Sequence, residues 1–326
     1  MLFRSSKQLS DLFQEVRINR IGEGTYNTVY ELRGNYVYRL LSFDAVLFNQ
    51  IKDIINSLVE FEATRQNVSN DDILMFLLKS KDLISLASVK VLQEFNEIVK
   101  VLAPLKMTPH MIHSHVIKQL PLSFEKKYNL ATPNKTTVYF AEIQDKYDTN
   151  VHEFILNKSH IIDDKTLKEI IFQILYTLYV YDYVFDSRFR HNDLATTNVL
   201  MNVRSDFNAS YEFKPKKSRK EKQNFKVKNS VFATIADFDL LHVFAADKLQ
   251  NSAVVGDYLQ QYGIVPQKNK SFDTYKFLYH IYEALLIRLR ETPDLDLTET
   301  LEFLKSVLPE RDRKSTRLNS SHLVIS

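Results

Sequence analysis

The segment DDKTLKEIIFQILYTLYVYDYVF, residues 163 to 185, is predicted to be a long helix that is apolar on most of its surface. Such a helix must be covered by other elements on nearly all sides, so it requires a folded core around it. Asp163 or Asp164 is expected to cap its first turn. With 326 residues and 44% hydrophobic content, the chain can supply that core in one large domain or in two lobes.

Segments with strand character precede this helix, and further strands and helices follow it. Residues 16 to 41 alternate and are rich in Val, Ile and Tyr, with RGN as a hairpin turn. Apolar residues at i, i+3 and i+4 spacing predict helices between residues 43 and 103, in FNQIKDIINSLVEF and VLQEFNEIVKVL. The other expected strands are 113–124, 136–144, 198–204 and 231–237, and the expected closing helices are 272–290 and 296–308. This order predicts an α+β protein of two lobes joined near residues 143 to 150.

The chain contains no Cys, which excludes disulfides, thiolate metal sites and cysteine nucleophiles. Its start, MLFRSSKQLSDLF, has no apolar signal-peptide core, and no apolar run of 18 residues occurs. We therefore expect an intracellular, cytoplasmic protein with no membrane partner.

The final segment, DRKSTRLNSSHLVIS (residues 312 to 326), resembles the translation of a sequencing-library adapter. We expect it to be a non-native tail, with a native Ser-rich tail as the alternative. Without it the chain has 40 basic and 39 acidic side chains, a net charge of +1 instead of +3. The overall charge then gives no argument for a nucleic-acid partner.

A second charged segment, KPKKSRKEKQNFKVK (residues 214 to 228), holds seven Lys and one Arg against one Glu. We expect a solvated hairpin insertion there. The alternatives are a docking arm for an acidic partner or nucleic acid, and a localisation signal.

Polar side chains suited to metal–nucleotide chemistry occur in three places. In RHNDLATTNVLMN, residues 190 to 202, Asp193 is placed to accept a proton from a hydroxyl and Asn198 to hold Mg²⁺ through its amide oxygen. In TIADFDL, Asp237 follows a strand, where a second metal ligand is expected. In IGEGTYNTVY, Gly22 and Gly24 form a turn whose backbone N–H groups can lie over phosphates.

In this order the motifs resemble those of the protein-kinase superfamily, from about Val16 to about Leu289. IGEGTYNTV resembles the Gly-rich loop, YVYRL the third-strand lysine segment, HNDLATTN the catalytic loop and ADFD the metal-binding segment. The resemblance implies a two-lobed protein-kinase-like fold, with a small β-rich N-lobe carrying a helical insertion (residues 1–143) and a reduced, mainly helical C-lobe (144–311). Divergent kinases of large DNA viruses carry similar motifs, which adds an infected host cell or virion to the expected locations.

The resemblance assigns a role to each matching residue. Asp193 would be the catalytic base, with Asn198 and Asp237 as Mg²⁺ ligands. Arg39 stands where the family has its phosphate-binding lysine, and Glu97, with Glu94 as runner-up, matches the helix glutamate that pairs with it. Asp273, in SFDTYKFLYHIY, would brace the catalytic loop. The residues expected around ATP are Ile21, Gly22, Gly24, Val29, Arg39, Glu142 and Ile143, the last two through their backbone as the hinge beside Ala141.

Several positions depart from the family pattern. Asn27 replaces the third glycine of the loop, and Arg39 replaces lysine. Asn192 replaces the arginine of the catalytic-loop triplet, so an activation-loop phosphate would find no arginine there. Ala195 replaces the lysine two residues after the base, which removes a cation from the γ-phosphate. Asp239 replaces the last glycine of the metal-binding segment and adds a carboxylate near the metals.

These departures leave three functions open. The first is a Ser/Thr protein kinase, favoured by IGEGTYNTVY and by the helix before the catalytic loop. The second is a small-molecule phosphotransferase of the aminoglycoside or choline kinase type, favoured by HND and DFD. The third is a catalytically inactive nucleotide-binding protein, favoured by Arg39 and Ala195 but opposed by the retained Asp193, Asn198 and Asp237. The expected partners are ATP with Mg²⁺ and a protein substrate.

Overall fold

The computed structural model describes residues 19–23, 27–32, 35–44, 81–102, 107–112, 114–119, 137–203, 207–213, 223–244 and 269–309. Contacts divide the chain into two compact units, one of Met1–Asn96, His113–Lys146 and Asn251–Val255, the other of Glu97–Ile112, Tyr147–Gln250 and Gly256–Ser326. The chain passes into the second unit after Lys146, close to the predicted boundary. Residues 97 to 112 also belong to the second unit, although the sequence placed them in the first. The expected tail at 312–326 lies outside the described residues.

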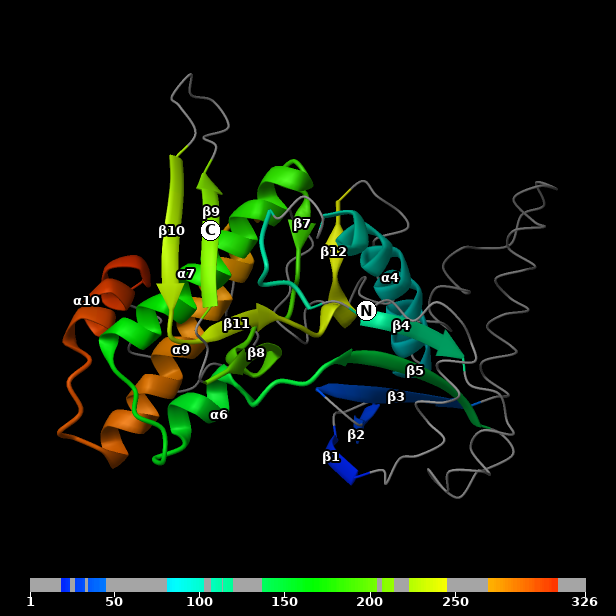
Figure 1. The fold of residues 1–326 in the computed structure, drawn as a ribbon, viewed down its shortest axis with the longest axis horizontal. Helices are drawn as coiled ribbons and strands as arrows, with labels where there is room; N and C mark the ends of the chain where they lie inside the picture. Colours follow the sequence, from blue (N-terminus) through cyan, green and yellow to red (C-terminus); the bar gives the residue numbers. More distant parts are fainter. Residues whose placement is uncertain are drawn as a thin grey trace. The chain divides into compact units, whose positions relative to one another are not determined.

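The first unit is built on a five-stranded antiparallel sheet with the order β1-β2-β3-β5-β4 (Figure 1). Its strands are β1 (Asn19–Glu23), β2 (Asn27–Leu32), β3 (Tyr36–Asp44), β4 (Ser114–Gln119) and β5 (Thr137–Asp145). The strands expected from alternation within residues 16–41, 113–124 and 136–144 are confirmed where the structure describes them, whereas residues 16–18 and 120–124 lie outside the described part. Tyr38, Leu41 and Ile143 of the central strands are fully buried, which places the core of the unit on β3 and β5.

Helix α4 (Lys81–Leu102) packs on this sheet with its N-terminal part. Val89 joins Leu41 and Phe140 in one apolar cluster. Asn96 Nδ2 donates to the carbonyl oxygen of Ser114 at 2.7 Å, and the Ser114 N–H donates back to Asn96 Oδ1 at 3.1 Å. The helix expected at VLQEFNEIVKVL is confirmed as its C-terminal half, whereas FNQIKDIINSLVEF lies outside the described residues.

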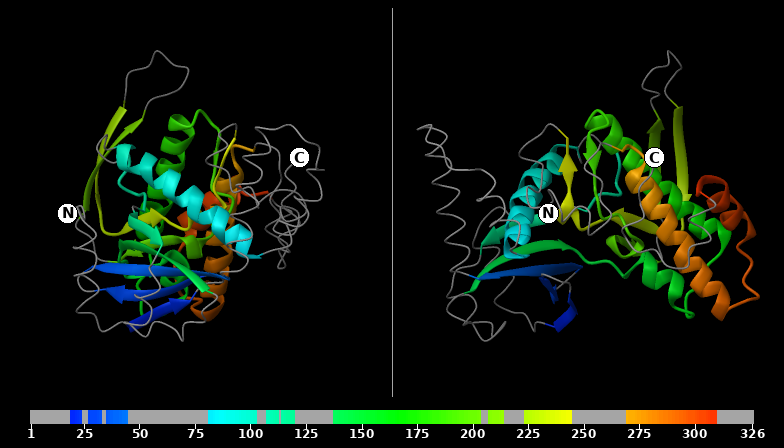
Figure 2. Two further views of the ribbon diagram at one scale, coloured as in Figure 1. Left: turned by 90° about the vertical axis from the view of Figure 1, so that its right-hand side faces the viewer. Right: turned by 180° about the vertical axis from the view of Figure 1, so that it is seen from behind.

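The second unit has helices α6 (Val151–Leu156), α7 (Asp164–Val184), α9 (Phe272–Glu291) and α10 (Thr298–Val307). Helix α7 is the long apolar helix of the sequence, and it contacts α9, α10 and strand β11 (Figure 2). Asp163 is its N-cap and accepts from the Thr166 N–H at 2.7 Å. Asp164 instead accepts from the Thr300 N–H at 2.8 Å, at the start of α10. The neighbouring aspartates thus serve the N-termini of two different helices.

Short strands in the second unit carry the candidate site. Strands β6 (Thr149–Asn150), β8 (Val199–Asn202) and β11 (Phe232–Ile235) form an antiparallel sheet of order β11-β8-β6. Strand β7 (Phe189–Arg190) pairs with β12 (His242–Val243). The expected strands near 198–204 and 231–237 are confirmed as β8 and β11.

The last part of the basic segment 214–228 is a strand. Strands β9 (Phe207–Phe213) and β10 (Gln223–Asn229) pair in register from Phe207↔Asn229 to Phe213↔Gln223, as a projecting ribbon in Figures 1 and 2. Val227 packs on the buried cluster of Tyr176, Val180, Ala209 and Tyr211. The last six residues of the segment therefore belong to a strand packed on the second unit, while residues 214 to 222 lie outside the described part.

In the part of the chain that the structure describes, no helix is both long enough and apolar enough to cross a membrane.

Candidate active site

The residues from Arg190 to Asn198 connect β7 to the short helix η2 (Thr196–Asn198), which leads into β8. Asn192, in the middle, has a φ of 71°. Non-glycine residues adopt this left-handed conformation rarely, and Asn tolerates it better than most. The turn therefore stores backbone strain, which surrounding contacts must offset.

Helix α9 provides the main contact that holds this turn. Asp273 accepts hydrogen bonds from the backbone N–H groups of His191, at 2.7 Å, and Asn192, at 3.0 Å. Burial raises the pKa of Asp273, while both backbone hydrogen bonds and the charge of Arg190 oppose the rise. The expected contact of Asp273 with this loop, made from a neighbouring helix, is therefore present, and the catalytic role of the loop stays a prediction.

His191 connects the loop to the segment of Asp237, which is expected to bind metal. Its Nε2 lies 2.9 Å from the carbonyl oxygen of Ala236, and its Nδ1 lies 3.3 Å from the backbone nitrogen of Asp193. A carbonyl only accepts and a backbone N–H only donates, so both contacts are satisfied by the neutral ring with its proton on Nε2. The buried ring thus fixes Ala236 and Asp193 relative to each other.

Asn192 makes a second connection to the same segment. Its Nδ2 donates to the carbonyl oxygen of Leu240 at 2.6 Å. The adjacent Arg190 is buried, with its guanidinium 5.0 Å from the ring centroid of Phe244 and 5.4 Å from that of Phe272. The side chain of Asn192 is therefore held in an internal contact with Leu240. The guanidinium of Arg190, two positions earlier, lies against two aromatic rings.

Asp193 is held by two side chains from different elements. Lys276 Nζ of helix α9 lies 2.6 Å from Asp193 Oδ1, and Asn198 Nδ2 lies 3.0 Å from Asp193 Oδ2. Burial alone would raise the pKa of Asp193, but the charge and hydrogen bond of Lys276, followed by the hydrogen bond from Asn198, bring it below the ordinary value. The carboxylate is thus ionised at neutral pH, as acceptance of a proton requires.

The two proposed metal ligands lie at the same end of one strand pair. Val199 of β8 is opposite Ile235 of β11, so Asn198 and Asp237 both stand just beyond this pair. The Ala236 N–H donates to the carbonyl oxygen of Asn198 at 2.9 Å, which closes that end. Asp237 has a φ of 62°, a second strained position, and is followed by the short helix η3 (Phe238–Leu240), which contains Asp239.

This donor set fits Mg²⁺ bound together with phosphates. Both amide hydrogens of Asn198 are used, on the carbonyl and carboxylate oxygens of Asp193, so the amide oxygen is the atom left for a cation. Asp237 adds a carboxylate oxygen, and Mg²⁺ usually takes one or two such protein ligands beside phosphate and water. Within the described ranges no group of three His, Asp or Glu side chains could hold a metal by itself.

In the first unit, Arg39 of β3 pairs with Glu142 of β5. Arg39 Nη1 lies 3.5 Å from Glu142 Oε2, both side chains are buried, and the Ser114 hydroxyl donates to the same carboxylate. The two residues are direct cross-strand partners, so they share one face of the sheet. The buried carboxylate of Glu142 therefore lies beside Arg39, the cation that is expected to contact the nucleotide phosphates.

The sheet does not fit the hinge role expected for Glu142 and Ile143. Strand β5 lies between β3 and β4, and each of these residues has a partner on both sides. Backbone N–H and C=O groups of a central strand are directed at its neighbours. These groups are consequently occupied by the sheet, and the side chain of Glu142, rather than its backbone, is the feature that bears on function.

Glu97 lies in the C-terminal half of helix α4. Its side chain is 69% exposed and pairs with Lys100, one turn further along α4. Glu97 belongs to the second unit and Arg39 to the first, so their expected pairing stays a prediction. The runner-up, Glu94, lies in the part of α4 that belongs to the first unit.

The Gly-rich segment is described on both sides of its turn. Ile21 and Gly22 lie in β1, Val29 lies in β2, and Gly24 lies outside the described residues. Val29 is opposite Gly22 on one side and Arg39 on the other. Val29 and Arg39 therefore share a face of the sheet, but their contact with ATP stays a prediction.

Sequence reasoning missed Lys276. The residue lies in the quoted motif SFDTYKFLYHIY, three positions after Asp273, so both side chains lie on the same side of α9. That spacing was the available signal, because a helix that braces the loop through Asp273 brings Lys276 to the loop as well. This contact places a cation beside Asp193, and the loss of a cation from the γ-phosphate at Ala195 stays a prediction.

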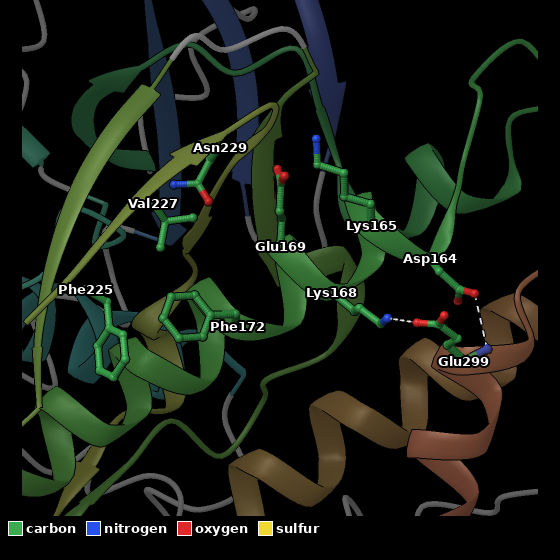
Figure 3. A pocket seen from close by; sticks show the side chains of 9 residues that line it. All are labelled: Asp164, Lys165, Lys168, Glu169, Phe172, Phe225, Val227, Asn229 and Glu299. Carbon is green, nitrogen blue, oxygen red and sulfur yellow. Dashed lines mark hydrogen bonds and ion pairs between the residues drawn. The ribbon is translucent and has the colours of Figure 1, made fainter. Parts of the chain in front are cut away.

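A pocket of about 560 Å³ is found elsewhere in the second unit, between α7, β10 and the start of α10 (Figure 3). Lys168 pairs with Glu299 there, and Glu169 accepts from the N–H and hydroxyl of Ser230. No residue of the loop from Arg190 to Asn198 lines it. The lining residues are Asp164, Lys165, Lys168, Glu169, Phe172, Phe225, Val227, Asn229 and Glu299. This pocket is separate from the groups that surround Asp193.

No protein-family model matches the chain, and no curated protein matches it. The chain is similar in structure to a chain in the crystal structure of the yeast RNA Pol II CTD kinase CTDK-1 complex, with a TM-score of 0.35 and 14% sequence identity. The similarity covers 72% of this chain and 49% of that one, so this chain spans about half the length of that protein. Because this similarity is low, the functional argument rests on the site itself.

Proposed function

We propose that the chain is an ATP-dependent phosphotransferase of the protein-kinase-like superfamily that transfers the γ-phosphoryl group to Ser or Thr hydroxyls of a protein substrate. One observation carries the proposal: the Asp193 carboxylate is held between Lys276, at 2.6 Å, and Asn198, at 3.0 Å. Asn198 is in turn tied through Ala236 to the segment of Asp237. These contacts support the proposal, because they connect the segments of the proposed proton acceptor and of the two proposed metal ligands.

In the proposed reaction, Asp193 orients the acceptor hydroxyl and takes its proton. The hydroxyl oxygen forms a bond to the γ-phosphorus while the bond from that phosphorus to the β,γ-bridging oxygen breaks, which leaves ADP and a phosphate ester. Lys276 and Asn198 hold the carboxylate in one orientation, so little reorganisation is needed when the hydroxyl arrives.

Asn198 and Asp237 would hold Mg²⁺, which when bound neutralises phosphate charge. Arg39 is proposed to contact the α- and β-phosphates. Its pairing with Glu142 supports this role, because a buried carboxylate restrains the orientation of the guanidinium.

Lys276 weakens the argument for an inactive protein, since the cation missing at Ala195 is replaced by another one beside Asp193. The small-molecule phosphotransferase differs in its acceptor. The fixed contact of Asn192 with Leu240 and the additional carboxylate of Asp239 suit that class equally well. The acceptor must therefore be identified by experiment.

The test is mass-spectrometric detection of phosphate transferred from ATP·Mg²⁺ to three acceptors: the chain itself, generic proteins and small amino-alcohols. We expect phosphoserine or phosphothreonine on protein, and no product when Mg²⁺ is removed with a chelator. Phosphorylated amino-alcohol without protein product would establish the small-molecule alternative. ATP binding without any product would establish the inactive alternative.

A further inference from the structure

Lys276 lies in helix α9, 83 positions after Asp193, and its side chain contacts the loop. Its Nζ lies 2.6 Å from Asp193 Oδ1 and 3.1 Å from the carbonyl oxygen of Asn192. The Lys276 side chain is 12% exposed, whereas that of Asp193 is 42% exposed. The cation is thus mostly enclosed, and the carboxylate to which it binds is open to solvent and to an acceptor.

The N-terminal end of α9 contacts the loop with two opposite charges. Asp273 accepts from the N–H groups at positions 191 and 192, and Lys276 donates to the carbonyl at 192 and the carboxylate at 193. Side chains of one helix therefore bind hydrogen-bonding groups of three consecutive loop residues. This arrangement fixes the backbone and also sets the direction of one side chain, that of Asp193.

We propose that Lys276 is a positioning residue for phosphoryl transfer, which holds the Asp193 carboxylate toward the acceptor and provides from helix α9 the positive charge that the loop lacks at Ala195. This inference rests on the proposed function. Positive charge beside a transferring phosphoryl group stabilises the negative charge that is distributed over its oxygens.

Two other interpretations make different predictions. If the ion pair only stabilises the fold, its loss lowers stability and leaves the turnover of the folded enzyme unchanged. A pair with one partner as exposed as Asp193 contributes little to stability in most proteins, so this interpretation does not explain the enclosure of Lys276. If Lys276 instead blocks Asp193, removing its charge raises the rate.

The test uses the full chain and four variants. Lys276→Met removes the charge and keeps most of the length of the side chain, and Lys276→Arg keeps the charge with a different shape. Ala195→Lys in the Lys276→Met background returns a cation to the loop itself. Lys305→Met, at an exposed lysine of α10, is the matched control.

The measurements are kcat, KM for ATP and the thermal unfolding midpoint of each variant. We expect Lys276→Met to lower kcat by ~10²-fold, the size of effect found when one charge-stabilising donor is removed, with KM for ATP changed by less than about threefold. Lys276→Arg should lose less, Ala195→Lys should recover part of the lost rate, and Lys305→Met should match wild type. Partial recovery by Ala195→Lys also rules out misfolding as the cause of the loss.

Three results would overturn the inference. A Lys276→Met enzyme with wild-type kcat, or with a raised kcat, shows that the lysine does not assist transfer, and the proposed function still stands. A lowered unfolding midpoint with no recovery by Ala195→Lys shows a structural role only. A wild-type chain that transfers no phosphate to any acceptor removes the proposed function, and this inference with it.

Discussion

Arg39 and Glu142 form a buried ion pair across strands β3 and β5, with Nη1 3.5 Å from Oε2. A buried charge that loses its partner is costly, because the remaining ion stays out of water without compensation. Arg39, the residue proposed to contact the nucleotide phosphates, is therefore also expected to stabilise the fold of the first unit.

We expect Arg39→Ala to lower the free energy of unfolding by about 3–5 kcal/mol, since it leaves the Glu142 carboxylate buried and uncompensated. Arg39→Lys keeps the charge and should keep transfer activity. Adding Glu142→Leu to Arg39→Ala should recover much of the loss. Urea unfolding of the single and double variants measures the coupling, and additive losses would show that the two side chains do not depend on each other.

Asp237 and Asp239 should differ in their effect on nucleotide binding. Asp237 follows the strand end that Ala236 ties to Asn198, whereas Asp239 lies within η3. We expect Asp237→Ala to reduce the gain in ATP affinity on adding Mg²⁺ by at least ~10-fold, and Asp239→Ala to have a much smaller effect. Calorimetric titration with ATP, with and without Mg²⁺, measures both. Equal losses would mean that Asp239 is also a metal ligand.

A buried histidine should make the second unit sensitive to acid. His110 has no exposed surface, and its ring nitrogens contact the carbonyl oxygen of Ala233 and the hydroxyl of Tyr211, each at 2.8 Å. Burial lowers its pKa to about 4, which the hydrogen bond to Ala233 partly opposes. Between pH 6.5 and 4 the unfolded chain binds the proton more readily, so stability falls as the pH drops through this window.

His110 alone is expected to account for a loss of roughly 3 kcal/mol between pH 7 and pH 4. His242, whose pKa burial and then Arg190 lower to about 4, adds to the same trend. His110→Asn keeps a donor for Ala233 and removes the titrating ring. Urea unfolding at several pH values should show a shallower pH dependence in this variant, and an unchanged dependence would contradict the assignment.

The basic segment should separate into a dispensable part and a structural part. Phe213 and Gln223 are paired at the end of the hairpin, so a two-residue Asn-Gly turn can replace residues 214–222. That replacement should leave transfer and stability unchanged. Deleting 214–228 removes most of β10, including Val227 on its core cluster, and should cost at least ~2 kcal/mol. Equal stability of both variants in urea would contradict the packing role of β10.

The long elements were predictable because their apolar spacing is strong. Helix α7 and helix α9 follow the expected ranges closely, and Asp273 contacts the loop as its motif implied. The hairpin expected around residues 214–228 is present as the pairing of β9 with β10. The packing of Val227 on the core was missed, because a high density of lysines hides the alternation that places it inward. The contact of Lys276 with Asp193 joins residues 83 positions apart. A local sequence pattern does not predict which distant residue a lysine side chain will contact.

The expected hinge failed for a related reason. Residues 136–144 were recognised as a strand, but the sequence does not state which strands lie beside it. Once β4 and β3 flank β5, the backbone groups of Glu142 and Ile143 are used within the sheet. Strand order depends on long-range pairing, and single-strand patterns carry little information about it.

The most direct test of the proposed chemistry is the comparison of wild type with Asp193→Asn. The amide has nearly the same shape as the carboxylate and can still accept from Lys276, so the fold and ATP binding should persist. The amide cannot act as a general base, and transfer should fall by ~10²-fold or more. An Asp193→Asn enzyme that binds ATP·Mg²⁺ and transfers phosphate at the wild-type rate would show that this loop is not the catalytic loop of a phosphotransferase.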